Sequence, residues 1–315
     1  MAQHFLLTAA AHSMSLGKIM RLTDNQAHEA FVAIRFADNG GAASAPRCEC
    51  TAVDTYAARR IWKCKACSHQ FSVTSGTIFA SRKLPVLDYL AAIAIFVNAV
   101  KGISALQLGR DLDVQYKTAF VLAHKLREAI AAEQMQGKLS GTVEVDGAYF
   151  GGHSKPENKK ADRPDRRLLP QNKKQVVAVM RERRGRTLPF VVAKESDAVA
   201  IMRERVAAGS IVHADEAPGW DKLHAFYEMH RINHSLAFSL DGACTNQAES
   251  FFSRLRRAEL GQHHHISGKY LAAYAVEMAW REDRRRACNG EQHRAATAAA
   301  LGHPVSRMWA GYWQR

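Results

Sequence analysis

The sequence has no hydrophobic run long enough to cross a membrane and no low-complexity tract. The apolar run from Phe5 to Ala11 is too short to span a bilayer, and no Lys or Arg precedes it, as one would in a signal peptide. These absences argue against a membrane or exported protein, and we expect a cytoplasmic one. At 315 residues the chain can bury a substantial core and hold two or three domains.

Cysteines are too few and too unevenly spread for a disulfide scaffold. Of the six, four are close together, and Cys244 and Cys288 stand alone. The four are arranged as C-x-C, thirteen residues, then C-x-x-C, which is typical of two metal-binding turns in a zinc ribbon. We therefore predict a Zn²⁺ site; the alternative is a set of buried thiols without a metal. Its ligands would be Cys48, Cys50, Cys64 and Cys67.

Acidic residues are outnumbered: 30 Asp and Glu face 44 Lys and Arg, for a net charge of +14. A surplus of this size favours a polyanionic partner such as DNA, although charge alone also fits a merely soluble basic protein. The segment from Lys155 to Lys174 is especially basic and has no apolar period. It is either a loop that contacts phosphate or an ordinary solvated loop.

Residues 85 to 132 have helical periodicity. A nearly all-apolar stretch from Leu87 to Val100 is followed by two amphipathic segments, Ile103 to Leu112 and Tyr116 to Ala131, separated by a short turn. This spacing fits a helix-turn-helix, and an ordinary helical bundle is the alternative. The second helix is expected to expose polar residues that could enter a major groove: Gln115, Lys117, Thr118, Lys125 and Arg127.

From residue 141 the pattern changes to strands. Segments 141–150, 175–180 and 187–193 predict three antiparallel strands, followed by a helix, a strand at 210–215, a helix near 220–229, a short strand near 232–235 and a long helix. This is the element order of a ribonuclease-H-like α/β domain with a mixed five-stranded sheet. The expected domains are a helical segment at 1–40, a zinc ribbon at 41–80, a helical DNA-binding region at 81–135, the catalytic domain at 136–286 and a tail at 287–315.

Three carboxylates occupy matching places in that order. Asp146 and Asp215 end two of the predicted strands, and Glu249 lies on the helix that follows. Hard oxygen ligands suit Mg²⁺, or Mn²⁺, and two such ions could support displacement at phosphorus. Glu144 is the rival for the first position, because strand alternation puts it on the same face as Asp146.

Basic and amide side chains near Glu249 suggest contacts to substrate. Arg256 follows Glu249 by two helical turns and Asn246 precedes it by one, so both can reach the same substrate. No signature supports a Ser/His or Cys/His nucleophile.

Several motifs together resemble the insertion-sequence transposases of group fifteen-ninety-five, which join a zinc ribbon to a DDE catalytic domain. The resemblance covers about residues 27 to 286. It is carried by CKACSHQFSVTSGTIF at 64–79, VDGAYFGG at 145–152, HADEAPGW at 213–220, TNQAESFFSRLRR at 245–257 and GQHHHISGKYLAAYAVEMAWRED at 261–283.

The resemblance implies that Asp146, Asp215 and Glu249 form the catalytic triad, with Arg256 where the family places a Lys or Arg after the glutamate. We expect Arg257 beside it to contact DNA as well. It also implies binding of terminal inverted repeats, hydrolytic release of 3′ ends, their attack on target DNA, and a homo-oligomer assembled on DNA. The rival hypotheses are a non-catalytic DNA-binding regulator and a nuclease that cleaves without joining.

Two departures from the family pattern concern the metal sites. Family members commonly have C-P-x-C at the first turn, where this chain has Ala45-Pro46-Arg47-Cys48. Cys50 would then replace the missing cysteine, or the ribbon would bind zinc poorly. Many members also follow the first aspartate with glutamate, where this chain has Gly147. The second departure leaves the triad intact.

Overall fold

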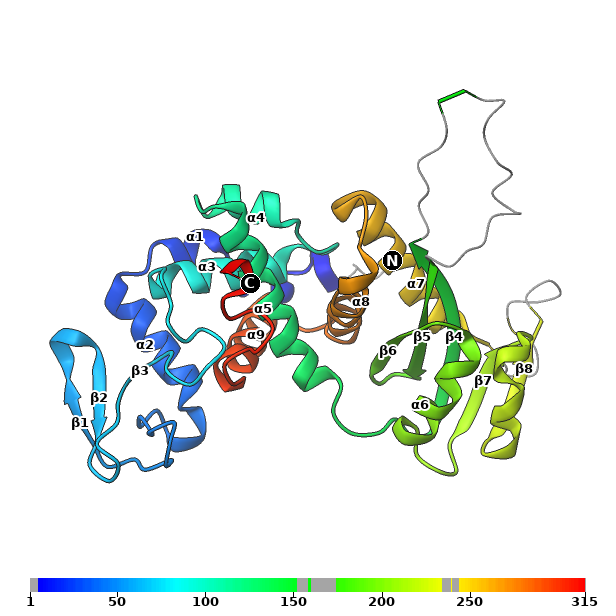
Figure 1. Ribbon diagram of the computed structural model, residues 1–315, viewed down its shortest axis with the longest axis horizontal. Helices are drawn as coiled ribbons and strands as arrows, with labels where there is room; N and C mark the ends of the chain where they lie inside the picture. The colour runs from blue at the N-terminus through cyan, green and yellow to red at the C-terminus, as the bar shows by residue number, and fades with distance from the viewer. Residues whose placement is uncertain (1–4, 152–157, 160–173, 234–238, 240–243, 315) are drawn as a thin grey trace. The chain divides into compact units, whose positions relative to one another are not determined.

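The computed structural model divides the chain into two compact units, which are considered separately below (Figure 1). The first comprises residues 1–133 and 284–315, and the second Gln134–Asp283. The structure describes residues 5–151, 158–159, 174–233, 239 and 244–314. Almost all of the basic segment from Lys155 to Lys174, interpreted as either a phosphate-contacting or a solvated loop, lies outside these residues. Among the helices that the structure describes, none is both long and apolar enough to cross a membrane.

Four helices form the body of the first unit: α1 (Leu16–Met20), α2 (Asp24–Arg35), α3 (Val86–Asn98) and α9 (Asn289–Gly302). Helix α2 starts after Thr23, whose side chain forms a capping box with Gln26, and Asp24 is the first helical residue. Helix α3 is buried on nearly all sides, in keeping with its apolar sequence. Helix α9 lies in the expected C-terminal tail and packs on α2 and α3, and its buried His293 Nε2 lies 3.1 Å from the Leu90 carbonyl.

The zinc-ribbon region is a three-stranded antiparallel sheet of β1 (Val53–Tyr56), β2 (Ile61–Cys64) and β3 (Gln70–Ser72). It is too small to have a core of its own. Trp62 and Phe71 face each other across β2 and β3, and both are buried. The Trp62 ring makes an edge-on contact with the ring of Phe36 at the end of α2, with 5.9 Å between the ring centres. The small sheet is therefore stabilised by apolar contacts with the helical part of the unit.

The predicted helix-turn-helix consists of α4 (Ala105–Asp111) and α5 (Tyr116–Gln134). The two helices approach closely at Gly109, where a Cβ would lie 3.1 Å from the Val114 carbonyl oxygen. Gln115, Lys117 and Thr118 are exposed at the start of α5, as expected, and Lys125 is half-buried.

The expectation that Arg127 is exposed was wrong. It is 2% exposed, and its guanidinium carbon lies 5.9 Å from the centre of the Phe96 ring on α3. Helix α5 is covered on more than one side, because the C-terminal residues Trp309, Tyr312 and Trp313 also pack around Phe120. Of the five residues predicted to be exposed, Gln115, Lys117 and Thr118 at the start of α5 are fully accessible, and Lys125 is partly so.

The second unit contains the predicted mixed five-stranded sheet. Its strands are β4 (Thr142–Gly151), β5 (Lys174–Glu182), β6 (Thr187–Val192), β7 (Ile211–Asp215) and β8 (Glu228–Ile232). Their order is β6-β5-β4-β7-β8, with antiparallel pairs among the first three and parallel pairs from β4 to β7 and from β7 to β8. This topology is that of a ribonuclease-H-like domain, which confirms the predicted fold class. Strand β8 ends at Ile232, where the sequence pattern had it begin, and a 3₁₀ helix, η7 (Pro218–Ala225), precedes it.

Helices cover both faces of this sheet (Figure 1). Alternate residues of β5 point to opposite sides: Ala178 and Met180 pack with α6 (Ala198–Arg205), whereas Val177 and Val179 pack with α7 (Asn246–Ala258) and α8 (Gly268–Asp283). A strand buried on both faces needs the continuous apolar run that β5 has. The central strand β4 is thus held rigidly between two helical layers.

Candidate catalytic and metal-binding sites

The two aspartates lie side by side on neighbouring central strands. Strand β4 pairs with β7 in parallel, with Val145 opposite Ala214, so Asp146 and Asp215 occupy the next step of the same ladder. Asp215 is the last residue of β7, but the expectation that Asp146 ends its strand was wrong, because β4 continues past it to Gly151 while pairing with β5. Asp146 Oδ1 accepts a hydrogen bond from the Gly147 amide at 2.7 Å, and Asp215 Oδ1 accepts one from the Ala217 amide at 3.2 Å.

The third carboxylate, Glu249, comes from α7, which packs on β4 and β5. The charge of Glu249 is one of those that raise the pKa of Asp146. Burial, together with the charges of Asp215, Glu249 and Glu195, raises the pKa of Asp146 to about 7, against a smaller lowering by the Gly147 amide. Like charges in partly buried surroundings repel one another, and a divalent cation would relieve that repulsion. Among the described residues, no three of these four carboxylates have oxygens within 4.8 Å of one another, so their side chains would have to draw closer to share an ion. The chemistry of the donors, hard carboxylate oxygens, is the kind that Mg²⁺ or Mn²⁺ prefers.

Sequence reasoning missed one acidic neighbour of this group. Glu195 is half-buried in the short 3₁₀ helix η6 (Glu195–Asp197) that follows β6, and burial together with the charge of Asp215 raises its pKa. No local pattern marks Glu195, because it lies about fifty residues from Asp146 and twenty from Asp215. Only the folded sheet brings the three together.

Glu144, the rival for the first aspartate, has a different position. It is completely buried, and its Oε2 accepts hydrogen bonds from the backbone amides of Gln247 at 2.8 Å and Ala248 at 3.2 Å. Its Oε1 accepts a hydrogen bond from Arg183 Nε at 3.0 Å. A carboxylate at the first turn of a helix satisfies amides that have no partner within the helix. Glu144 therefore joins the start of α7, three residues before Glu249, to β4, the strand that contains Asp146.

A similar link joins β7 to the same turn. His213, two residues before Asp215, accepts a hydrogen bond through Nδ1 from the Cys244 amide at 3.3 Å. Arg183 Nη2 lies 2.8 Å from the Cys244 sulfur. Burial, and then the charges of Arg183 and His230, lowers the pKa of His213 to about 4, so the ring is neutral at pH 7 and Nδ1 can accept. Cys244 therefore has a structural role, because its amide bonds to His213 and its sulfur to Arg183.

The residues predicted to contact DNA are distributed over both units. In the second unit Asn246, Arg256 and Arg257 are exposed on α7, and the Arg256 guanidinium lies 6.0 Å from the centre of the Phe150 ring at the far end of β4. In the first unit Lys117 is exposed at the start of α5 beside Trp313, while burial lowers the pKa of the half-buried Lys125. Each is positioned on a regular helix.

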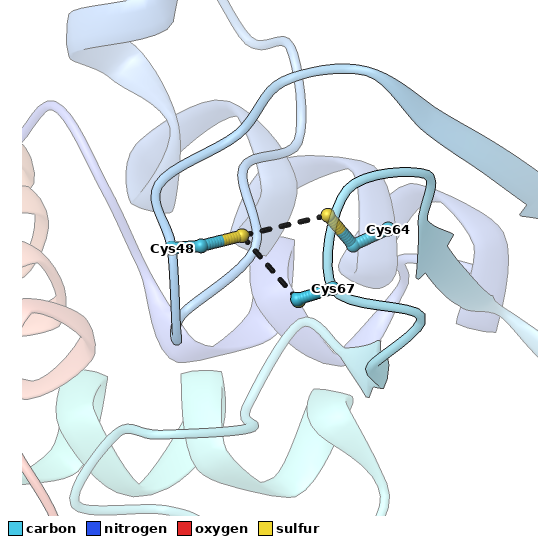
Figure 2. A group of neighbouring side chains, drawn as sticks. All are labelled: Cys48, Cys64 and Cys67. Carbon is cyan, nitrogen blue, oxygen red and sulfur yellow. Dashed lines mark hydrogen bonds between the residues drawn. The ribbon is translucent and has the colours of Figure 1, made fainter.

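Three of the four predicted zinc ligands converge in the ribbon. The sulfur atoms of Cys48, Cys64 and Cys67 lie within 4.8 Å of one another and point toward a common centre (Figure 2). Cys48 Sγ is 3.5 Å from Cys64 Sγ and 3.4 Å from Cys67 Sγ, near the edge of about 3.8 Å that a tetrahedral zinc thiolate site requires. The Cys67 amide in particular lowers the pKa of Cys64 to about 7, which favours the thiolate form that zinc binds. Among the described residues this is the one group of three or more ligand atoms within that limit.

Cys50, the fourth predicted ligand, does not join them. The two metal-binding turns have matching backbones: the Ala45 amide bonds to the Cys50 carbonyl as the Cys64 amide bonds to the His69 carbonyl, each at 3.0 Å. The Glu49 amide bonds to the Ala45 carbonyl as the Ser68 amide does to that of Cys64. Glu49 and Ser68 also share a left-handed φ, 58° and 57°.

This correspondence explains the position of Cys50. Cys48 matches Cys67, and Ala45 matches Cys64, so the residue at the fourth ligand position is the buried Ala45. Cys50 matches His69, which lies beyond the turn. The residues present thus fit a site with three thiolates and not the four-cysteine site that the spacing suggested.

The topology and the chemistry of the two sites are those of a DDE transposase with a zinc ribbon. A model of the ISXO2-like transposase domain matches residues 138–283, and a model of the transposase zinc-ribbon domain matches residues 22–70. The chain belongs to the IS1595 family of ISXO2-like transposases.

A curated relative and two solved structures are similar to the chain. An uncharacterized protein in the transposable element ISH50 of Halobacterium salinarum is 24% identical over 244 residues, which are 73% of this chain and 81% of the relative. The Mos1 strand transfer complex aligns at 11% identity and a TM-score of 0.25 over 67% of this chain and 78% of that one. A pre-cleavage Mos1 transpososome aligns at 12% identity and 0.24, over 68% and 79%.

Proposed function

We propose that the protein binds the terminal inverted repeats of its insertion sequence, cleaves at the 3′ ends and transfers those ends into target DNA. The family membership supports transposition in general. The observation that carries the specific proposal is that Asp146 and Asp215 occupy the same step of the ladder between β4 and β7, with Glu249 in electrostatic reach on α7.

In this proposal Asp146, Asp215 and Glu249 hold divalent ions, with Mg²⁺ or Mn²⁺ as the natural choice. Two bound ions would supply Lewis-acid activation of the attacking oxygen and stabilisation of the leaving oxygen at phosphorus. The chain's own task is to keep the three carboxylates in register. The sheet does this for the aspartates, and the contacts of Glu144 with α7 do it for Glu249.

DNA binding in this proposal involves side chains of both units. Arg256, Arg257 and Asn246 on α7 contact DNA near the cleavage site, and Lys117 and Lys125 belong to the helix-turn-helix that reads the terminal repeat. Zinc held by Cys48, Cys64 and Cys67 stabilises the ribbon, which has no core of its own. Two or more copies assemble on paired ends, as the family resemblance implies.

The test is an end-cleavage and strand-transfer assay on a labelled duplex that carries the terminal repeats flanking the coding sequence. We expect the wild type to cleave and join in Mg²⁺, and Asp146→Asn to lose both activities by a factor of about 10³ or more while still binding the duplex, because DNA binding does not need the carboxylate.

Other results would point to the rival functions. Equal activity of Asp146→Asn and wild type would remove Asp146 from the reaction. Salt-sensitive binding without any metal-dependent cleavage would favour a DNA-binding regulator, and cleavage without joining would favour a nuclease.

A further inference from the structure

Residues 305–314, close to the end of the chain, form a segment that is anchored on helix α5. The ring of the buried Trp309 stacks on the ring of His124, with 4.3 Å between the ring centres. Ser306 Oγ donates a hydrogen bond to Glu128 Oε2 at 2.6 Å and accepts one from the Trp309 amide at 2.9 Å. Because His124 and Glu128 both belong to α5, the segment has a fixed position on that helix (Figure 1).

The last turn of this C-terminal segment, η9 (Tyr312–Gln314), brings Trp313 to Lys117 at the start of α5. The indole Nε1 of Trp313 donates a hydrogen bond to the Lys117 carbonyl at 3.3 Å, and Lys117 Nζ lies 5.3 Å from the centre of the indole ring. That distance is typical of a cation–π contact. An exposed lysine otherwise samples many rotamers, so the ring restricts where the ammonium group of Lys117 can lie.

The start of α5 is open to a partner. Gln115, Lys117 and Thr118 are exposed, and the side chains of Tyr116 and Trp313 are 49% and 47% exposed. Lys, Gln, Thr and Tyr side chains are among those that contact the phosphates and sugars of DNA. The charge of the first unit favours the same partner, because its 21 Lys and Arg against 11 Asp and Glu give it +10 of the chain's net +14.

We propose that the C-terminal segment is part of the DNA-binding surface of the helix-turn-helix, and that Trp313 is a positioning residue that holds Lys117 for contact with a DNA phosphate. The inference rests on the proposed function, in which α5 binds the terminal repeat. The two family models match residues 22–70 and 138–283, so neither includes this surface.

The test is binding of the full-length protein to a labelled duplex that carries the terminal repeats, measured by fluorescence anisotropy at several salt concentrations. We expect Trp313→Ala to weaken binding by about two- to fivefold, the size of an exposed cation–π contact. Trp313→Phe keeps a ring beside the ammonium group and should stay closer to the wild type. Lys117→Gln should reduce the magnitude of the salt slope by about 1, and Trp313→Ala should change it in the same direction.

A double variant separates positioning from a merely structural role. If Trp313 acts through Lys117, adding Trp313→Ala to Lys117→Gln should cost no further affinity. The matched control is Phe226→Ala in the second unit, which removes another exposed ring beside a cation, since the Arg203 guanidinium lies 4.0 Å from the centre of the Phe226 ring. It should bind the duplex as the wild type does. Thermal unfolding followed by circular dichroism checks that each variant is folded.

The outcomes distinguish this inference from the proposed function. Trp313→Ala with wild-type affinity and salt slope, or with its full loss retained in the Lys117→Gln background, would overturn the positioning role and leave the proposed function standing. A change in the sedimentation of the DNA-free protein, with DNA binding unchanged, would make the surface a contact between copies of the chain and overturn the inference. A wild type that binds the duplex in the expected way but neither cleaves nor joins it would overturn the catalytic proposal alone.

Discussion

At the scale of single residues, the ribbon shows how one substitution changes the expected metal site. The matching hydrogen bonds of the two turns put Ala45 where a fourth cysteine would bind. Cys50 is only two residues from Cys48, yet its sulfur lies 3.9 Å from the Ala52 carbonyl, outside the group of three. Proximity along the chain does not make it a ligand, because the left-handed turn at Glu49 separates the two side chains.

Zinc binding should follow this assignment. We expect Cys48→Ser to weaken zinc binding strongly, Cys50→Ser to leave it unchanged, and Ala45→Cys to strengthen it by about 10- to 100-fold by completing a tetrahedral site. Affinity is measured by competition with a chromophoric chelator. A loss of affinity in Cys50→Ser equal to that in Cys48→Ser would restore the four-cysteine site that the spacing predicts.

At the scale of elements, the position of α7 determines where Glu249 lies relative to Asp146 and Asp215, the carboxylates that we propose as catalytic. Glu144 accepts hydrogen bonds from the backbone amides of Gln247 and Ala248, and its ion pair with Arg183 compensates its buried charge. A charge-assisted hydrogen bond contributes about 1.5 to 3 kcal/mol, so these contacts are worth a large part of the stability of a typical domain. Glu144, the sequence-based rival of Asp146, therefore positions the helix that carries Glu249.

Removing this support should affect stability and activity together. Glu144→Gln keeps the shape but loses the charge that α7 and Arg183 require, and we expect it to lower the free energy of unfolding of the second unit by about 2 to 3 kcal/mol. Urea unfolding followed by circular dichroism measures this loss, with Glu204→Gln as the control. End cleavage should fall even where the variant is folded; a stability within about 0.5 kcal/mol of the wild type would contradict the anchoring role.

At the scale of the whole molecule, the net charge of +14 should make the proposed DNA binding depend strongly on salt concentration. Each phosphate neutralised by a basic side chain releases a counterion, so the logarithm of the binding constant should fall linearly with the logarithm of salt concentration. We expect Arg256→Gln to reduce the magnitude of that slope by about 1, as loss of one phosphate contact does. Fluorescence anisotropy at several salt concentrations measures the slopes. Lys18→Gln, an exposed change of the same charge in the first unit, should leave the slope as it is; a slope for Arg256→Gln equal to that of the wild type would remove Arg256 from the DNA contacts.

Much of the architecture was predictable from the order of residues. The alternation around Val143 and Val145, the apolar run of β5 and the spacing of helix and strand signals identify a ribonuclease-H-like sheet, and the strand pairing confirms it. The errors arose where neighbours come from distant parts of the chain. Arg127 is buried by α3 and the C-terminal residues cover α5, neither of which the local helical period of α5 can indicate.

The sequence by itself determined which elements form, because periodicity, capping residues and turn residues act within a few positions of one another. It also determined that Asp215 would end a strand and that two cysteine turns would face each other, whereas the strand of Asp146 continues past the predicted end to Gly151. Only the tertiary structure decided which side chains share a site. The parallel pairing of β4 and β7 sets Asp146 beside Asp215, Glu144 caps a helix that starts about a hundred residues later, and Ala45 replaces a ligand that the cysteine count seemed to supply. These outcomes depend on sheet register and on packing between distant elements, which no local pattern records.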